Sequence, residues 1–346
     1  MNALVEIKDL AVSYQTYGGE VQSVRGVSLK IERGKTVALV GESGCGKTVT
    51  SKAIMGLVET PGYLKPGSSI LYAGNEITGF TKKQWNAFRG KECGMIFQDA
   101  LVALNPTMQI GRQILENLKN HFPEIGMDEM KKRSVEMLGK VGIPDAERCM
   151  KKYPHELSGG MRQRVMIAMA MITKPSLLIA DEPTTALDVT IQAQILRLMK
   201  DLQKETNMAI LLITHDMGVV AEIADEIVVM YAGKVVEQGN SRDIFYHPQH
   251  PYTSALLASV PRIDESDGRE LVTIEGNVPN MLHPPQGCGF YSRCPYAMKV
   301  CRLYQPDVTD LGCGHETFCW MQDSRAKQCM ETAGRAGGQT ETGGVI

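Results

Sequence analysis

A glycine-rich stretch fits the pattern G-x-x-x-x-G-K-[ST] of phosphate-binding loops, and its residues are Gly41, Glu42, Ser43, Gly44, Cys45, Gly46, Lys47 and Thr48. Glycines let the backbone close around phosphates without a Cβ clash, and the start of a following helix directs unpaired N–H groups at the anion. We expect Lys47 to reach the β- and γ-phosphates and the Thr48 hydroxyl to bind Mg²⁺. The apolar run Thr36–Val40 precedes the loop and a predicted helix over Lys47–Val58 follows it, which is the context that nucleotide binding requires.

Two carboxylates follow a second apolar run. Asp181 and Glu182 come directly after Leu177–Ala180, which is short enough to be a buried strand. The carboxyl end of such a strand is the edge at which open α/β sheets bind ligands. Asp181 is placed to hold Mg²⁺ through water, and Glu182 is the candidate base that polarises the water attacking a γ-phosphate. A helix cap is the alternative use of such an aspartate, but the glycine-rich loop favours nucleotide hydrolysis.

The nine cysteines are distributed unevenly along the chain. Three are scattered over the first 150 residues, and six lie within the last 59: Cys288, Cys294, Cys301, Cys313, Cys319 and Cys329. Glu6, Lys8 and Asp9 stand where a signal peptide needs an apolar run, so we expect the chain to stay in the cytosol. In that reducing compartment, clustered cysteines are more often metal ligands than disulfides.

The candidate site residues require a sheet flanked by helices to position them. Leu4–Tyr14 and Val27–Ile31 alternate apolar and polar residues, as half-buried antiparallel strands do. The apolar runs Leu177–Ala180 and Ile210–Thr214 are separated by a helical segment, which is the pattern of parallel strands joined by a crossover. Apolar residues at intervals of four predict a mainly helical insert over about 100–173.

Composition divides the chain into three parts. Residues 1–246 carry the motifs above, 247–323 are rich in proline and cysteine, and 324–346 contain few large apolar side chains. We expect a nucleotide-binding domain, a small C-terminal domain and a disordered tail, in that order. The 37 Lys and Arg and 39 Asp and Glu give a formal net charge of −2, which disfavours nucleic-acid binding. No apolar stretch approaches the roughly 18 residues that a membrane-spanning helix needs.

A third motif indicates which family of nucleotide-binding proteins the chain resembles. The stretch Leu157–Arg164 resembles the signature of ATP-binding-cassette (ABC) proteins, and Ser158 stands 23 residues before Asp181, as in that family. Ser158 can cap the helix that follows, so that its hydroxyl and the amides of Gly159 and Gly160 point outward from a positive helix end. Such a group binds phosphate, but the chain already has its own phosphate loop. We therefore expect these three residues to complete the ATP site of a second, facing subunit.

The resemblance to ABC ATPases implies roles for four further residues. Gln98 resembles the glutamine that contacts Mg²⁺ and the lytic water and that links the core to the helical insert. His215 resembles the switch histidine that contacts the γ-phosphate, and Asp188 lies in a segment similar to the loop that crosses the dimer interface. Tyr14 matches the aromatic residue on which adenine stacks, with a tyrosine of the strand core as the alternative.

The C-terminal part resembles the corresponding region of dipeptide and oligopeptide importer ATPases, through His250–Thr253 and Gly287–Cys301. That subfamily contains members with a [4Fe–4S] cluster held by four cysteines, and the matching residues here are Cys288, Cys294, Cys301 and Cys319. Their open spacing favours a cluster over zinc, whose ligands are usually closer in sequence, without excluding zinc. Cys313 departs from the pattern and is an alternative fourth ligand, and a set of unrelated free thiols is the alternative to a metal site.

The resemblance implies an α/β fold with an ABC-type P-loop NTPase core, an antiparallel β subdomain, a helical subdomain and a small, loop-rich, cysteine-containing C-terminal domain. It also implies an ATPase subunit at the cytoplasmic face of the cell membrane, bound to two transmembrane permease subunits and a second ATPase, usually a paralogue. We expect residues 98–106 to form the dock for a permease helix. Cargo would be selected by a separate solute-binding protein, so peptides, nickel and other solutes stay open.

Two other classes of function compete with import. A cassette ATPase acting on nucleic acid should show a coiled coil, a second cassette or a basic face, and the sequence has none of these. A metal or redox sensor would use the cysteine region as its working part, with ATP in a regulatory role.

Overall fold

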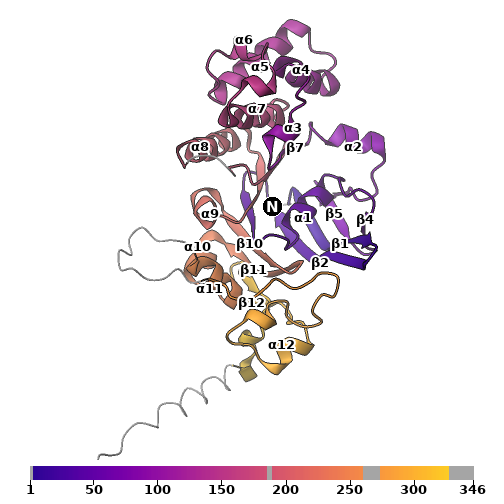
Figure 1. Cartoon of the computed structure of the whole chain (residues 1–346), viewed down its shortest axis with the longest axis vertical. Helices are drawn as coiled ribbons and strands as arrows, with labels where there is room; N and C mark the ends of the chain where they lie inside the picture. Colours follow the sequence, from indigo (N-terminus) through magenta and orange to yellow (C-terminus); the bar gives the residue numbers. More distant parts are fainter. Residues whose placement is uncertain (1–2, 185–188, 260–272, 327–346) are drawn as a thin grey trace, which may run out of the picture.

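The computed structural model describes residues 3–184, 189–259 and 273–326 (Figure 1). Its largest sheet has the strand order β12-β13-β11-β10-β3-β9-β8-β7. Five of these strands are parallel: β3 (Thr36–Val40), β7 (Cys93–Ile96), β8 (Leu177–Asp181), β9 (Ala209–Thr214) and β10 (Glu226–Tyr231). The predicted parallel strands are therefore neighbours, and their carboxyl ends share one edge of the sheet.

The parallel strands are buried on both faces, which explains why nearly all their residues are apolar. In β3, Ala38 and Val40 join the cluster that includes residues of α8 (Val189–Thr206) and α9 (Met217–Ile223). Val37 and Leu39 point to the other face, where they pack with α1 (Lys47–Ile54) and the second sheet. Side chains alternate between two cores, so each strand packs against α8 and α9 on one face and against α1 and the second sheet on the other.

The second sheet is antiparallel, as the alternating pattern at the start of the chain predicts. It consists of β1 (Val5–Thr16), β2 (Gly19–Ile31), β4 (Gly62–Leu64), β5 (Ser69–Tyr72) and β6 (Asn75–Glu76), followed by α2 (Lys82–Phe88). The preceding helix, α1, ends at Ile54 rather than at the predicted Val58. Gly56 takes a left-handed conformation with φ +59°, and the Trp85 ring occupies the place where a Cβ would stand. A glycine that approaches an aromatic ring thus ends the helix early.

The predicted insert over 100–173 is helical and stands at one end of the molecule (Figure 1). It contains α3 (Ala100–Ala103), α4 (Ile110–His121), α5 (Met127–Lys140), α6 (Ala146–Cys149), a 3-10 turn (Pro154–Glu156) and α7 (Gly159–Met171). Ile110, Ile114 and Leu118 are fully buried along one face of α4, as their spacing predicts. The expected fold class is confirmed. Within the described ranges, no helix combines the length and the apolarity needed to cross a membrane.

The C-terminal region lies at the opposite end and extends the central sheet (Figure 1). Its helical elements are α10 (Ser241–Tyr246), α11 (Pro251–Ala258), α12 (Lys299–Leu303) and two 3-10 turns (Tyr291–Arg293 and Trp320–Gln322). The hairpin of β12 (Thr309–Asp310) and β13 (Glu316–Thr317) pairs with β11 (Lys234–Asn240), so that Glu237 faces Thr317. Most of the segment expected to be a disordered tail, from residue 327 onward, lies outside the described residues.

Candidate functional site

The glycine-rich loop joins β3 to α1, as the motif requires, and its backbone needs glycine at two positions. Gly41 has φ +147° and Gly46 has φ +104°. A Cβ on Gly46 would stand 2.5 Å from the carbonyl oxygen of Ser23, and one on Gly41 would overlap the carbonyl oxygen of Met230. A side chain at either position would therefore push the loop away from the sheet.

Lys47 and Thr48 begin α1 and face the predicted phosphate position and the metal-binding carboxylate. The Lys47 ammonium, nearly buried, donates to the carbonyl oxygens of Gly41 at 2.6 Å and Glu42 at 3.0 Å. The Thr48 hydroxyl donates to Oδ1 of Asp181 at 3.2 Å. Burial raises the pKa of Asp181, while the hydrogen bond from Thr48 opposes that shift. The hydroxyl and carboxylate that sequence reasoning assigned to Mg²⁺ thus lie side by side.

Glu182 is the centre of a three-residue cluster at the sheet edge. Its Oε2 accepts a hydrogen bond from Nε2 of Gln98 at 2.8 Å, and its Oε1 lies 3.0 Å from Nδ1 of His215. These residues follow β7, β8 and β9, three adjacent parallel strands whose carboxyl ends bring them together. Glu182 has φ +47°, in the left-handed region that non-glycine residues seldom adopt. Three predicted catalytic residues, distant in sequence, form one hydrogen-bonded group.

The predicted signature residues Ser158 and Gly159 are exposed at the start of α7. The Ser158 hydroxyl caps α7 by accepting a hydrogen bond from the backbone N–H of Met161 at 3.4 Å. Ser158 and Gly159 are exposed, and no described atom lies within 4 Å of where a Gly159 Cβ would stand. The nearest atom to the corresponding position on Gly160 is a methyl group of Ile191, at 3.6 Å. The helix start is accessible to an external ligand. Asp188 lies outside the described residues.

Comparison with known proteins agrees with this geometry. Residues 24–185 match the ABC transporter family, and residues 236–301 match the oligopeptide/dipeptide transporter C-terminal region. The chain is 53% identical to the oligopeptide transport ATP-binding protein OppD of Bacillus subtilis over 92% of its own length and 88% of that protein. It is 49% identical to the dipeptide transport ATP-binding protein DppD of the same organism, over 95% and 98% of the two chains.

The chain belongs to this family of ABC transporter ATPases. In its fold it also resembles the dimeric bacterial ABC transporter cassette MJ0796, with a TM-score of 0.62, 25% identity, and coverage of 68% of this chain and 98% of that one. The predicted ATPase activity follows from the family and from the intact phosphate loop and carboxylate pair.

In this ABC ATPase, Tyr14 lies between the core and the surface. It is half-buried on β1, opposite Val21 and Gly62, and its ring packs over the position where a Gly62 Cβ would stand. Burial raises the pKa of its phenol. Both predicted uses of this tyrosine, adenine stacking and strand packing, are compatible with this placement.

The C-terminal cysteines divide into an inner group and one exposed thiol. Burial raises the pKa of Cys288 to about 11, with further contributions from Cys301 and Cys294. Burial raises the pKa of Cys319 to about 12, and the same three cysteines add to it. Cys313, at the turn of the β12–β13 hairpin, is exposed with φ +54°. The four cysteines matched by the family resemblance are thus electrostatic neighbours.

The expected iron–sulfur site is nevertheless not supported by ligand geometry. Among residues 3–184, 189–259 and 273–326, no three His, Cys, Asp or Glu side chains are arranged to hold a metal ion. Four thiolates on one zinc ion would each lie about 2.3 Å from it and so would nearly touch one another. The arrangement of the thiols here therefore does not resemble a closed zinc site.

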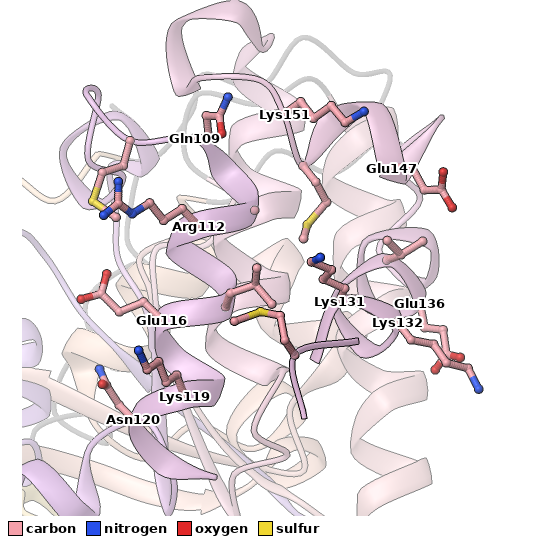
Figure 2. Close-up of a pocket in the computed structure, with 16 residues that line it drawn as sticks. Gln109, Arg112, Glu116, Lys119, Asn120, Lys131, Lys132, Glu136, Glu147 and Lys151 are labelled. Atoms are coloured by element: carbon pink, nitrogen blue, oxygen red, sulfur yellow. The ribbon is translucent and has the colours of Figure 1, made fainter. Parts of the chain in front are cut away.

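The helical subdomain of the ABC ATPase contains a separate groove of about 1120 Å³. Polar side chains of α4 lie on one side of it and those of α5 on the other (Figure 2). Apolar side chains also line it, namely Met108, Leu115, Met127, Val135 and Met150. The groove begins directly after the segment 98–106, where we expected a permease helix to dock.

Sequence reasoning missed two contacts between the C-terminal region and the phosphate loop. Arg293 forms an ion pair with Glu42, and the hydroxyl of Tyr252 accepts a hydrogen bond from the Glu42 backbone N–H. Both residues lie in segments that carried the subfamily resemblance, but no local signal indicated their partner. Contacts across more than 200 residues of sequence are set by how the chain folds back.

Proposed function

We propose that this ABC ATPase powers the import of di- and oligopeptides across the cytoplasmic membrane. The observation that carries the proposal is similarity to peptide-transport ATP-binding proteins over more than nine-tenths of the chain, including the C-terminal region. Its partners would be two permease subunits, a second ATPase that is a paralogue, and an extracytoplasmic solute-binding protein. The ATPase would lie at the cytoplasmic face of the membrane as a peripheral subunit.

In the proposed site, one set of residues binds the phosphates and Mg²⁺, and another residue activates the attacking water. Lys47 would bind the β- and γ-phosphates, and Thr48, Asp181 and Gln98 would hold Mg²⁺, whose charge would offset that of the phosphates. Glu182 accepts a proton from the attacking water. This assignment is supported by the hydrogen bonds that already join these side chains in pairs.

The remaining residues contact the adenine base, the γ-phosphate and the facing subunit. Tyr14 stacks on adenine, and His215 contacts the γ-phosphate while it orients Glu182. Ser158, Gly159 and Gly160 bind the γ-phosphate held by the facing subunit, and Asp188 lies at the interface between the two subunits. The exposed, capped start of α7 supports the role of Ser158, Gly159 and Gly160, whereas the role of Asp188 rests on the family resemblance alone. ATP would close the two subunits, and hydrolysis would reopen them.

Glu182→Gln tests the mechanism in the assembled transporter. Glutamine has the same shape as glutamate and can still accept a hydrogen bond from Gln98, so ATP binding should persist. Hydrolysis should fall about 10²- to 10⁴-fold, because a positioned general base contributes about that much. Glu222→Gln, at an exposed position on α9, is the matched control. Full activity of the Glu182 variant would refute the mechanism.

Uptake in proteoliposomes tests the cargo. Purified complex with its solute-binding protein should accumulate labelled tri- or tetrapeptides in an ATP-dependent manner. Uptake of nickel without uptake of peptides would favour the alternative solute. A chain that hydrolyses ATP but copurifies with no membrane subunit would favour a sensor with a metal-binding C-terminal region.

We also propose the groove between α4 and α5 as part of the permease dock. Its apolar lining suits the apolar face of a short amphipathic helix. Cations outnumber carboxylates among its polar lining residues: five cations, Arg112, Lys119, Lys131, Lys132 and Lys151, against Glu116, Glu136 and Glu147. A permease loop with acidic residues would complement that excess of positive charge. Leu115→Glu should disrupt assembly while the isolated chain keeps its affinity for ATP. Normal assembly of this variant would exclude the groove.

Finally, we propose that Cys288, Cys294, Cys301 and Cys319 bind an iron–sulfur cluster. Four thiolates are the usual ligand set of such a cluster, and the proposal is supported by the pKa of Cys319, which is raised by burial and additionally by the nearby thiols of the other three. Anaerobic purification followed by iron and sulfide determination and by electron paramagnetic resonance of the reduced protein tests it. Cys319→Ser should abolish the signal and Cys313→Ser should retain it, whereas stoichiometric zinc would refute the cluster.

A further inference from the structure

The C-terminal region reaches the Glu42 side chain of the phosphate loop through one arginine. Arg293, whose side chain is only 4% exposed, donates from both terminal nitrogens to the Glu42 carboxylate, at 2.6 and 3.0 Å. Its other N–H groups donate to the Tyr231 hydroxyl at 3.1 Å and to the carbonyl oxygens of Ile274 at 2.8 Å and Glu275 at 2.9 Å. All five guanidinium donors are therefore used, and the side chain is held in one orientation.

The backbone of Glu42 is held from the same direction. Its N–H donates to the hydroxyl of Tyr252 at 2.9 Å, and Tyr252 is fully buried. The Tyr252 ring packs against Tyr231 and Phe290, with centroid distances of 4.6 and 5.3 Å. An aromatic cluster that spans the core and the C-terminal region thus supports one residue of the phosphate loop through both its backbone and its side chain.

The charge of Glu42 makes this contact relevant to ATP binding. A carboxylate in a phosphate loop repels an incoming triphosphate, and the repulsion is strong where water is partly excluded. The Glu42 side chain is 25% exposed, so solvent screens it incompletely. A bidentate guanidinium neutralises the carboxylate and holds it in one position. The loop can then bind an anion although it carries an acidic residue.

We propose that Arg293 is a positioning residue for ATP binding: it neutralises Glu42 and holds the phosphate loop, so that the C-terminal region sets the affinity for nucleotide. Arg293 directly precedes Cys294 and ends a 3-10 turn that begins three residues after Cys288. Disorder in the cysteine-bearing segment would therefore reach the Glu42 carboxylate through the Arg293 side chain. The proposal depends on ATP binding by the chain and not on the identity of the transported solute.

Equilibrium binding of a fluorescent ATP analogue to the full-length chain tests the proposal. Arg293→Met should raise the dissociation constant about tenfold at low salt, which corresponds to about 1.4 kcal/mol. The loss should shrink as salt is added, because ions screen the unpaired carboxylate. Arg293→Lys keeps the positive charge but cannot form the bidentate pair of hydrogen bonds, so it should lose less affinity for ATP than Arg293→Met does. Arg302→Met, an exposed arginine of the same region, is the matched control and should bind like the wild type.

The double variant Arg293→Met/Glu42→Gln separates charge from a general loss of structure. If Arg293 acts on Glu42, removing the carboxylate as well should recover most of the affinity, to within about threefold of the wild type. This variant leaves no buried charge unpaired, so it keeps the test decisive if Arg293→Met alone does not fold. Thermal unfolding without nucleotide identifies that case. A folded double variant with affinity ten times weaker than wild type, or an Arg293→Met variant with unchanged affinity, would overturn the proposal.

Discussion

Glu237 joins the C-terminal region to the central sheet, and its replacement by glutamine should loosen that junction. The side chain is fully buried on β11. Its Oε1 accepts hydrogen bonds from the Gln249 backbone N–H at 2.7 Å and from Nε2 of His315 at 2.8 Å. Its Oε2 accepts one from the His250 backbone N–H at 2.9 Å. One carboxylate thereby anchors the start of α11 and the β12–β13 hairpin.

Glutamine at position 237 has only one oxygen. If that oxygen keeps the bonds to Gln249 and His315, the new amide nitrogen faces the His250 N–H, and two donors are buried against each other. The cost combines a lost charge-assisted hydrogen bond with an unsatisfied buried donor, about 3 kcal/mol in all. Glu316→Gln is the matched control, because that half-buried carboxylate accepts one side-chain bond, from Gln238. Its effect should stay below about 1 kcal/mol.

Urea unfolding followed by the fluorescence of Trp320 measures this difference. Trp320 lies in the C-terminal region, and Trp85→Phe removes the only other tryptophan. The midpoint for Glu237→Gln should fall, with a free-energy loss about three times that of Glu316→Gln. Equal midpoints for the two variants would refute the assignment of Glu237 as the anchor.

Three further outcomes follow from local geometry. Gly46→Ala should lower the free energy of unfolding by about 1–3 kcal/mol and abolish ATP binding, because φ +104° and the Ser23 carbonyl leave no room for a Cβ. Thermal unfolding measures the first effect and nucleotide titration the second. In metal-free protein at pH 8, Cys313 should react with iodoacetamide before Cys319, since the first is exposed and burial raises the pKa of the second to about 12; peptide mass spectrometry gives the order, and faster labelling of Cys319 would contradict it. Ser158→Arg should prevent ATP-dependent pairing of ATPase subunits on size exclusion while the single chain still binds ATP; loss of ATP binding by the monomer would mean that Ser158 serves its own site.

Local sequence was a sufficient guide to the phosphate loop and to the strands that flank it. Runs such as Thr36–Val40 are buried on both faces, so the four residues from Val37 to Val40 are all apolar and the strand is visible without context. The stripe of Ile110, Ile114 and Leu118 likewise predicted a buried helix face. The end of α1 was predicted too late, because the turn at Gly56 depends on the Trp85 ring, which comes from another element.

Other features have no local signal. The two-residue strands β12 and β13 are too short to show a period, and only pairing with β11 makes them strands. The spacing of the cysteines left Cys313 and Cys319 as alternatives for the fourth ligand. The hairpin turn exposes Cys313 and carries Cys319 back toward the other three, a difference that linear spacing does not contain.

The sequence by itself determined the chemistry of this protein: a loop for phosphates, carboxylates for metal and water, and the family that uses them. Those signals are short-range, because each motif must shape its own backbone. Only the tertiary structure decided which distant groups act on them. Glu182 meets Gln98 and His215 because three parallel strands end together. Arg293 meets Glu42 across 251 positions because the C-terminal region folds back beside the phosphate loop, where burial makes the pairing of their charges necessary.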